Sequence, residues 1–545
     1  MTFQGVGDMQ EFKSSEFQNF PKRLLLISPQ SKKVDAERAF MSPALGIVRI
    51  AGYLRSQGQE AEAYDPNLHM LTGYGPSLEE KLAEKSWDFI GFSVLEQTLM
   101  EDIQNMYLAQ KMCPNATLFA GGIEAQFNYQ TILDKTPCKI VILSEGEIST
   151  LMLTQEKPLH EIPGIVFKND AIPLSQELFN EATNTIKWEE NPYEEYWDYY
   201  VTKYGDTVTE ENLKEIHTVR VFSRNRCPIG CKFCSSTNQI TWGSNGTVPV
   251  ISATEDNLIH VIERIINSHP KVKTIYLTDD DFCIDKPSVI RFCQKAIERD
   301  FGDLTFMCFA RSRDLNEEML GWMKKANFRR LNIGIESFSE KVLQEMGKRC
   351  NVEHNYQALE MVKKYGVKAF LNIILITPET TLDDLETTVD SAIFYAQDDF
   401  YHVGVVLAIK PLKGTDFYET NSNYLSVIEA IPETKYYIKR DDMILANDPC
   451  VRSIQLKYWD NIDKVVKEKS KREGIVHKVA SNVSLVKLNY VKGLIEEMRH
   501  DQMDVNGIQN RYSSSQILDI PYNELQTVDV PESVVHADGM SQKDN

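Results

Sequence analysis

The sequence predicts an α/β protein with three parts. We expect an N-terminal doubly wound Rossmann-like domain, a partial (β/α)6 TIM-type barrel and a mainly helical C-terminal region. Two observations predict the two sheets: short apolar runs alternate with amphipathic segments over 22–170, and the same alternation returns over 215–420. A third observation predicts the last part: beyond residue 420 the pattern is largely helical.

The first series predicts five strands of a mostly parallel sheet. Its first run, 23–28, is almost entirely apolar, as a strand covered on both faces should be. The other strands are expected at 60–65, 88–94, 116–120 and 139–143, and helices at 45–58, 78–85 and 100–112.

The second series predicts six strand–helix turns, fewer than the eight of a complete barrel. The strands are expected at 217–222, 274–278, 304–310, 331–335, 369–376 and 402–409, and helices at 254–268, 286–298, 316–326, 353–365 and 381–396. Ligands of such barrels bind at the C-terminal ends of the strands, so the residues after each apolar run matter most.

Between and around these domains we expect a tail over 1–21, a linker over 171–214 and a helical region over 421–545. The acidic and aromatic run 187–206 has no clean period, and we interpret it as an ordered linker packed between domains; a surface loop is the alternative. Helices are expected at 461–473 and 483–498, ahead of a frayed end.

The composition narrows the class of protein. With 79 acidic and 59 basic residues, the net charge of −20 argues against a general nucleic-acid binder, which normally has a basic face. The longest apolar run, 370–376, is interrupted by Asn372, so no membrane span is expected. We expect a cytoplasmic protein without a secretory signal, whose clustered cysteines serve metal binding or catalysis.

Cys227, Cys231 and Cys234 form the sharpest motif, directly after the first barrel strand. Pro228 and Gly230 oppose a helix across the first gap, so the segment should loop and let the three sulfurs converge. Thiolates suit iron–sulfur clusters, zinc or copper(I). Structural zinc usually takes two separated ligand pairs, which are not seen here. Three thiolates on a cubane cluster leave one iron open; three incidental buried cysteines are the alternative.

This Cys-x₃-Cys-x₂-Cys segment after a first barrel strand resembles the radical S-adenosylmethionine (radical SAM) superfamily. The resemblance implies that the three cysteines hold a 4Fe–4S cluster whose open iron is chelated by SAM. One electron from the cluster then cleaves SAM to methionine and a deoxyadenosyl radical, which abstracts a hydrogen atom from the substrate.

Polar residues after later strands fit the same resemblance. Asp279 and Asp280 resemble the Asp-Asp-x-Phe segment of the subgroup with an N-terminal cobalamin-binding domain, which implies contact with the SAM ammonium; an acidic turn before a helix is the alternative. Arg311 is suited to a carboxylate. Glu336 and Ser337 resemble a Gly-x-Glu-Ser segment that lies near SAM.

One segment departs from the subgroup. After the fifth barrel strand many relatives have Gly-x-Pro-Gly-Glu-Thr, whereas Thr377 to Thr381 here contain no glycine. We expect Thr380 or Thr381 to cap the following helix instead.

The N-terminal sheet carries a second set of motifs. Small residues at the strand ends leave a crevice for an extended cofactor, and no dinucleotide or P-loop motif is present. The motifs Pro-x-Leu-Gly, Gly-Gly and Ser-Glu-Gly-Glu resemble the cobalamin-binding domain of the same subgroup. The resemblance implies cobalamin contacts from Leu45, Gly46, Ser93, Gly121, Gly122, Glu145 and Gly146. His69 is displaced from the position of an axial cobalt ligand, and we do not assign it that role.

The resemblance therefore implies an enzyme that uses a 4Fe–4S cluster, SAM and cobalamin to methylate an unactivated carbon, with no single catalytic side chain assigned. An oxidative cyclase or ring-rearranging enzyme of the same layout is the first alternative. A methylthiotransferase would need a second cysteine cluster, but Cys113 and Cys138 lie 25 residues apart; an electron-transfer protein is the last alternative. We expect a small-molecule or peptide substrate and an external flavodoxin- or ferredoxin-type electron donor.

Overall fold

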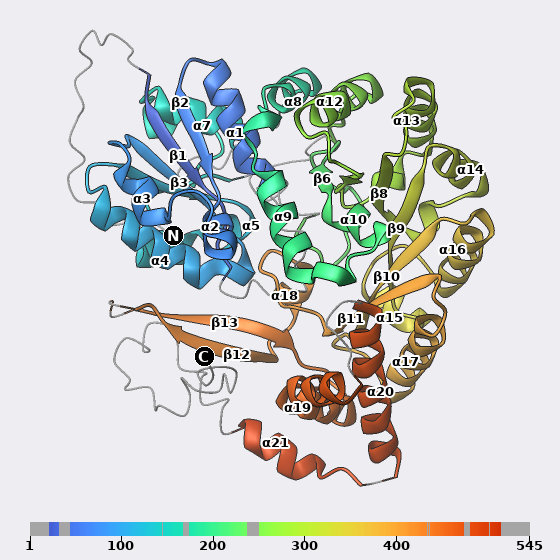
Figure 1. The fold of residues 1–545 in the computed structure, drawn as a ribbon. Coiled ribbons are helices and arrows are strands. Elements are labelled where there is room, and N and C mark those ends of the chain that lie inside the picture. Colours follow the sequence, from blue (N-terminus) through green and yellow to red (C-terminus); the bar gives the residue numbers. More distant parts are fainter. Residues whose placement is uncertain are drawn as a thin grey trace.

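In a computed structural model, two parallel sheets lie side by side, with a helical segment between them and a hairpin and long helices below (Figure 1). The structure describes residues 21–31, 44–143, 145–166, 174–236, 250–432, 434, 436–473, 480–500 and 502–513. Most of the predicted N-terminal tail, Ser42, Pro43, Ser144 and the predicted frayed end lie outside the described residues.

The N-terminal sheet has five parallel strands in the order β2-β1-β3-β4-β5, which confirms the doubly wound prediction. They are β1 Arg23–Ile27, β2 Glu60–Tyr64, β3 Phe89–Ser93, β4 Thr117–Gly121 and β5 Ile140–Val141. Leu24 and Leu26 pack with one apolar cluster and Leu25 and Ile27 with another, so β1 is covered on both faces.

Seven helices accompany this sheet in the described residues. They are α1 Leu45–Ser56, α2 Pro66–Thr72, α3 Leu78–Ala83, α4 Leu99–Met112, α5 Ile123–Phe127, α6 Tyr129–Lys135 and α7 Glu147–Thr154. Helices α1, α3 and α4 were predicted, whereas the short α2, α5, α6 and α7 were not. Side chains of α1 and α7 cover one face of the sheet, and those of α3, α4 and α6 cover the other.

The second sheet has six parallel strands in the order β11-β10-β9-β8-β7-β6, close to the predicted positions. They are β6 Thr218–Val221, β7 Thr274–Leu277, β8 Thr305–Arg311, β9 Phe328–Glu336, β10 Lys368–Ile376 and β11 Tyr401–Ala408. Within the described residues β6 and β11 do not pair, so the barrel is open.

Helices connect these strands, as expected for parallel neighbours. They are α12 Glu255–Ser268, α13 Lys286–Arg299, α14 Glu317–Lys325, α15 Glu340–Glu345, α16 Val352–Tyr365 and α17 Leu382–Ala396. Thr381 caps α17 and its hydroxyl accepts from the backbone N–H of Asp384, which confirms the predicted capping role.

The segment between the domains is helical, with α8 Gln176–Asn184, α9 Tyr193–Tyr204 and α10 Glu210–Ile216. Helix α8 contacts both α1 and α12, and α9 contacts α2. Trp188, Tyr193, Tyr196 and Tyr200 are almost completely buried. The aromatic residues therefore form an apolar wedge between the two sheets, although the sequence did not predict its helices.

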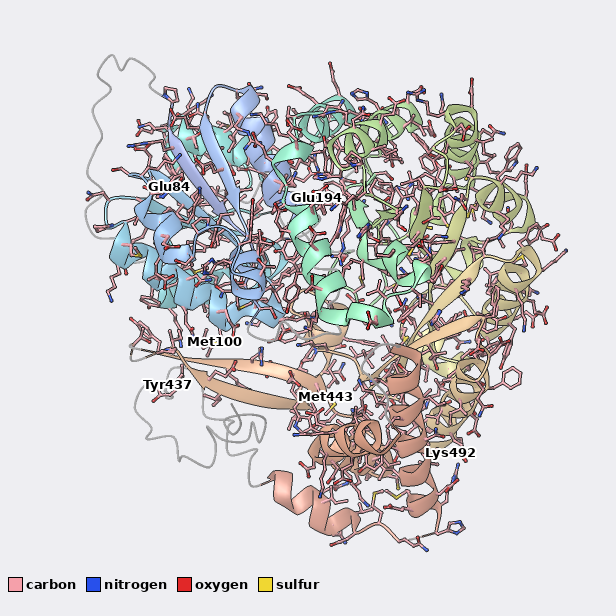
Figure 2. All side chains as sticks on the ribbon, viewed as in Figure 1. Glu84, Met100, Glu194, Tyr437, Met443 and Lys492 are labelled. Atoms are coloured by element: carbon pink, nitrogen blue, oxygen red, sulfur yellow. The ribbon has the colours of Figure 1, made fainter. Side chains whose placement is uncertain are left out.

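His269, at the end of α12, fastens this linker to the barrel. Its side chain is 2% exposed. Nδ1 lies 2.8 Å from the Glu194 carboxylate and Nε2 lies 2.7 Å from the carbonyl oxygen of Trp188. A hydrogen-bond acceptor therefore lies at each of the two ring nitrogens, and the ring links α9 and the Trp188 backbone to the barrel. Glu194 lies on α9, between the two sheets (Figure 2).

We expect His269→Ala to destabilise the protein by about 3 kcal/mol, because it removes a buried side chain together with its hydrogen bonds to Glu194 and to the Trp188 carbonyl oxygen. For a domain of this size the thermal unfolding midpoint should fall by roughly 6–12 °C. The control is His260→Ala, also on α12, where the exposed imidazole has only a 4.0 Å contact with Glu263. Equal thermal unfolding midpoints for the two variants, measured by tryptophan fluorescence, would contradict this role of His269.

The C-terminal region is mainly helical, as predicted, but it begins with a hairpin that the sequence did not predict. After α18 Asp416–Thr420 comes an antiparallel hairpin of β12 Tyr424–Ala430 and β13 Tyr437–Ile444. The hairpin extends beneath the N-terminal domain, with Tyr437 on the side of Met100 (Figure 2). Ile431 and Ile438 join the apolar cluster of β1 and β3, and Lys135 Nζ donates to the Tyr437 carbonyl at 2.8 Å.

Three helices complete the fold: α19 Pro449–Glu473, α20 Ala480–Arg499 and α21 Val505–Ser513. Helix α20 packs against α17 and the edge strand β11. None of the helices described is both long and apolar enough to span a bilayer.

Candidate active site

The three-cysteine loop begins six residues after β6 ends, at the C-terminal end of the open barrel. Cys227, Cys231 and Cys234 are in the thiol form, and their side chains are partly exposed. Gly230 has φ +78°, a conformation that favours glycine and turns the chain between the first two cysteines. The N–H of Cys234 donates to the carbonyl oxygen of Cys231 at 3.2 Å, so the loop is compact as predicted.

Backbone hydrogen bonds hold this loop from two sides. The N–H of Lys232 donates to the Met346 carbonyl at 3.0 Å, and the Lys232 carbonyl accepts from the N–H of Phe417 at 3.1 Å. Phe233 packs against an apolar cluster that contains Met346 and Phe417. The loop is therefore positioned by the end of α15 and by α18.

Within the described residues, no three Cys, His, Asp or Glu side chains lie close enough to hold a single metal ion. The three thiols act electrostatically on one another, so they lie near each other in the loop. A 4Fe–4S cluster needs no single-ion site, because each thiolate binds a different iron. Burial raises the pKa of Cys227 to about 11 and that of Cys231 to about 12.

Asp279 follows β7 and braces the segment that leads into the loop. Its carboxylate accepts from the backbone N–H groups of Ser223 at 2.8 Å and Arg224 at 2.7 Å, and from the Ser223 hydroxyl at 2.7 Å. Burial raises its pKa to about 6, against the lowering effect of these hydrogen bonds. Donors of the protein already bind both carboxylate oxygens of Asp279. Its side chain therefore supports this segment of the chain and does not face a ligand.

Asp280 is different, because its side chain is exposed. The carboxylate contacts the Ser236 side chain, and its charge acts on the thiol of Cys227. Of the two aspartates predicted here, Asp280 is therefore the one available to a ligand beside the cysteine loop.

Arg311 lies in a buried charge network that the sequence reasoning missed. Its Nε is 2.7 Å from Asp314 and 3.8 Å from Asp281, and Nη1 donates to the Lys348 carbonyl at 3.1 Å. Burial and the neighbouring Asp314 raise the pKa of Asp281. The guanidinium of Arg311 therefore lies at the predicted strand end, and the Asp314 carboxylate partly neutralises its charge.

Glu336 and Ser337 do not share one environment. Glu336 pairs with the ammonium of Lys348, and both side chains are at most 10% exposed. Ser337 is completely buried, and its hydroxyl lies 2.9 Å from that of Thr388 on α17. Glu336 is the last residue of β9 and has φ +60°, so the chain leaves the strand between the two residues and their side chains have different surroundings. The contact of Ser337 with SAM stays a prediction.

A cavity of about 230 Å³ lies at the carboxyl ends of β3, β4 and β5, beside α1. Its lining includes six of the predicted cobalamin residues: Gly46, Ser93, Gly121, Gly122, Glu145 and Gly146. Leu45, the seventh, packs against the apolar core instead. Gly122 has φ +94°, and a Cβ there would lie 2.9 Å from the Val94 carbonyl oxygen.

Polar groups that could bind a ligand also line the cavity. The Nη2 of Arg49 and the hydroxyl of Thr150 are buried without a hydrogen-bond partner among the described residues. Arg49 is held by Glu147, 3.1 Å away, and stacks over the ring of Phe179. Buried polar groups are rarely left unpaired, and the amide, hydroxyl and phosphate groups of cobalamin are suitable partners. The lining therefore fits that cofactor.

Asn225 joins the two candidate sites. It lines the same cavity and lies two residues before Cys227. Its backbone N–H donates to the carbonyl oxygen of Ile251 at 3.0 Å, and its side-chain oxygen accepts from the N–H of Ile251 at 2.8 Å. The cavity of the first domain and the thiols of the second thus adjoin through one fixed segment.

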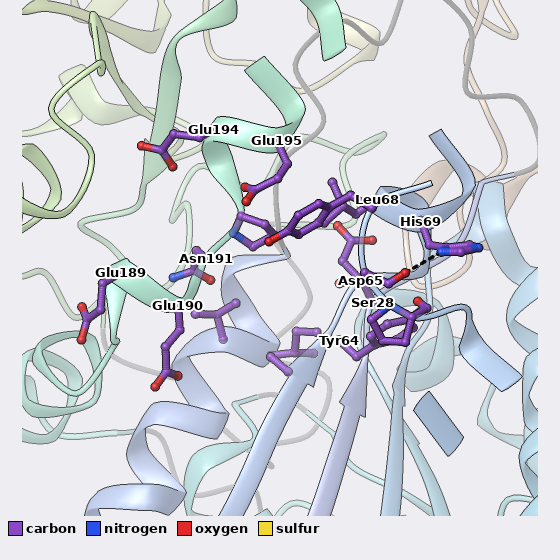
Figure 3. Close-up of a pocket in the computed structure, with 17 residues that line it drawn as sticks. Ser28, Tyr64, Asp65, Leu68, His69, Glu189, Glu190, Asn191, Glu194 and Glu195 are labelled. Atoms are coloured by element: carbon purple, nitrogen blue, oxygen red, sulfur yellow. Dashed lines mark hydrogen bonds between the residues drawn. The ribbon is translucent and has the colours of Figure 1, made fainter. Parts of the chain in front are cut away.

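His69 lies elsewhere, in a second cavity of about 340 Å³ at the edge formed by β1 and β2 (Figure 3). Its Nδ1 is 2.9 Å from the carbonyl oxygen of Gly75. Acidic side chains of the linker, Glu189, Glu190, Glu194 and Glu195, line the opposite wall. The structure therefore does not bring His69 to the glycine-lined cavity.

Comparison with known families gives this arrangement its context. Residues 221–392 match the model of the radical SAM superfamily, and residues 31–151 match that of the B12 binding domain; together they cover more than half of the chain. This chain belongs to the cobalamin-dependent radical SAM enzymes. Its two domains imply a 4Fe–4S cluster, SAM and cobalamin, which confirms the cofactors predicted from the sequence.

Relatives of this radical SAM protein differ in what they do. An uncharacterised methyltransferase of Pyrococcus horikoshii is 23% identical, over 69% of this chain and 79% of its own. An anaerobic magnesium-protoporphyrin IX monomethyl ester cyclase of Rubrivivax gelatinosus is 24% identical, over 67% of this chain but 64% of its own. The match thus spans less than two thirds of the cyclase.

Solved structures share the fold of this radical SAM protein. OxsB with aqua-cobalamin and SAM bound has a TM-score of 0.61 at 15% identity, over 95% of this chain and 83% of its own. The methyltransferase TsrM of Kitasatospora setae, with cobalamin and a 4Fe–4S cluster bound, has a TM-score of 0.56 at 14% identity, over 73% and 77% of the two chains.

Proposed function

We propose that this radical SAM enzyme methylates an unactivated carbon of its substrate. One observation carries the proposal: Asn225 belongs both to the glycine-lined cavity and to the segment that starts the cysteine loop. A methyl carrier in the cavity and a radical source at the loop would then act on the same substrate. An aliphatic C–H group has no useful acidity, so side-chain bases cannot activate it and cofactors must.

In this proposal Cys227, Cys231 and Cys234 hold the cluster, and the six glycine-cavity residues, with Arg49 and Thr150, hold cobalamin. When bound, the cluster supplies the electron that cleaves SAM, and cobalamin supplies the methyl group. Asp280 accepts from the SAM ammonium, and Arg311 and Glu336 line the strand ends beside it. The buried aromatic wedge around Tyr196 holds the two domains in a fixed relative position and excludes water from the space between them.

An oxidative cyclisation or another reaction without methyl transfer is the second candidate. The specific observation that favours it is the cyclase relative, which is as similar in sequence as the methyltransferase relative. A small-molecule or peptide substrate and an external flavodoxin- or ferredoxin-type donor in the cytoplasm complete either proposal.

One experiment separates the two candidates before the substrate is known. The protein is reconstituted without oxygen with iron, sulfide and hydroxocobalamin, reduced with titanium(III) citrate and incubated with methyl-deuterated SAM. Methylation predicts deuterated methyl on the extracted corrinoid, measured by mass spectrometry, together with 5′-deoxyadenosine. Release of 5′-deoxyadenosine with no label on the corrinoid would favour the second candidate, and cobalamin-free protein would remove the methyltransferase proposal.

We expect Asp280→Asn to weaken SAM binding by about 10–100-fold, because a charge-assisted hydrogen bond contributes about 1.5–3 kcal/mol. The iron content of the reconstituted protein should not change. Anaerobic equilibrium dialysis with labelled SAM measures the effect. The matched variant Asp279→Asn should instead lower the thermal midpoint, because Asp279 accepts three hydrogen bonds within the protein. Unchanged SAM affinity in Asp280→Asn would contradict the assignment.

A further inference from the structure

A buried ion pair lies behind the cysteine loop. The ammonium of Lys348 contacts the Glu336 carboxylate, with 7% and 10% of the two side chains exposed. Burying two charges is costly, and such a pair adds little net stability. Its presence beside a cofactor loop therefore calls for a role other than stability.

The backbone is shaped to hold this pair. Gly334 faces it, and a Cβ at that position would overlap the Lys348 ammonium and lie 2.6 Å from Glu336 Oε1. Glu336 itself has φ +60°, which is strained for a residue with a side chain. A glycine inside a strand and a glutamate with a left-handed backbone both cost stability. Both are needed to hold the Lys348 ammonium in its position.

The ammonium is tied to the loop that holds the thiols. The Met346 carbonyl binds the N–H of Lys232, and a Cβ on Gly347 would lie 3.1 Å from the Lys232 side chain. Lys348 follows directly. Among the charged groups that act on the Cys231 thiol, Lys348 has the largest effect and Glu336 a smaller one of opposite sign.

The other end of the loop has the opposite electrostatic environment. Asp280 and Asp281 both act on Cys227. The cluster position therefore lies between negative charge on the Cys227 side and a buried positive charge on the Cys231 side. Because Lys348 is buried, its positive charge is weakly screened.

We propose that Lys348 is a positioning residue that raises the reduction potential of the cluster held by Cys227, Cys231 and Cys234. The inference rests on the proposed cluster site. Reduction takes one electron from a low-potential donor and changes the cluster core from 2+ to 1+, so the three-thiolate site becomes one unit more negative. A fixed ammonium stabilises the more negative state, and Glu336 anchors the ammonium without cancelling its effect at Cys231.

Three variants test this proposal on protein reconstituted with iron and sulfide, without SAM or substrate. Titanium(III) citrate with viologen mediators sets the potential, and electron paramagnetic resonance counts the reduced clusters; each electron gained by a cluster oxidises one Ti(III) to Ti(IV). Lys348→Met should lower the ratio of reduced to oxidised cluster at least tenfold at fixed potential, about 59 mV for a one-electron couple. Glu336→Gln should raise that ratio. Lys341→Met removes an exposed lysine on α15 and should leave it unchanged.

The directions in which the two variants shift the ratio of reduced to oxidised cluster separate this role from a merely structural one. If the pair only supports the fold, Lys348→Met and Glu336→Gln shift the ratio in the same direction or lower cluster content alike, and the proposal is overturned. A ratio within twofold of the parent in Lys348→Met also overturns it. If Lys348→Met takes up no cluster, Glu336→Gln decides, since an unchanged or lowered ratio there rejects the proposal. Parent protein that binds no cluster would instead refute the proposed function.

Discussion

Replacing Cys231 by serine is expected to leave the reconstituted protein without its cluster. The hydroxyl is a hard, protonated group and does not replace a soft thiolate on iron. Iron should fall from about four per chain to a small fraction of that, and the broad visible absorption should disappear. Reductive cleavage of SAM to 5′-deoxyadenosine should fall by about a thousandfold or more, because the electron source is lost. Iron analysis and chromatography of the products measure both effects.

Cys113→Ser is the matched control for this prediction. Cys113 is a partly exposed thiol at the end of α4, and its Sγ lies 3.4 Å from the Leu82 carbonyl oxygen, which a serine hydroxyl can also bind. We expect parental iron content and activity. Retention of the cluster in Cys231→Ser, or one tightly held zinc in the parent, would refute the assignment of the loop.

Gly122→Ala is expected to abolish tight cobalamin binding. Its Cβ would lie 2.9 Å from the Val94 carbonyl oxygen and 3.3 Å from the Ser93 hydroxyl, so the turn after β4 must move. The positive φ adds about 1–3 kcal/mol of strain. Because Ser93 and Gly122 itself line the glycine-lined cavity, we expect the dissociation constant of hydroxocobalamin to rise by at least about tenfold, or ~1.4 kcal/mol. Gel filtration followed by visible spectra measures retained cobalamin.

Gly73→Ala is the control, because it imposes the same kind of backbone strain without the clash. Gly73 has φ +68°, and a Cβ there meets nothing within 4 Å. It caps α2, away from the glycine-lined cavity. We expect parental cobalamin retention with a small loss of stability. Equal losses of cobalamin in the two alanine variants would show that strain alone, and not the shape of the cavity, causes the effect.

The sequence predicted best the features that depend on local chemistry. Parallel strands covered on both faces are mostly apolar, so β1 and β10 were placed to within one residue. Small residues at strand ends were predictable for a similar reason, and Gly46, Ser93 and Gly122 do line one cavity. The cysteine loop was predictable because its turn residues lie within the motif itself.

Features that depend on distant partners were not predictable in this way. Helix α9 buries aromatic residues against α2 of the first domain and against His217 and His269 of the second, so its pattern has no single apolar stripe. Lys348 meets Glu336 only because the chain turns back after α15. The surroundings of Ser337 were not predictable either, because its hydroxyl partner Thr388 lies on α17, 51 residues further along the chain.

The hairpin of β12 and β13 has a consequence for how the chain is made. Ile431 and Ile438 complete an apolar cluster whose other members come mainly from the first 143 residues. At the usual rate of protein synthesis, Ile438 leaves the ribosome roughly 15–60 s after Leu143. During that interval the nascent first domain exposes the patch that the hairpin later covers. Chaperones that hold apolar surfaces are therefore expected to bind the growing chain, and a shortened gene that ends before the hairpin should yield aggregates.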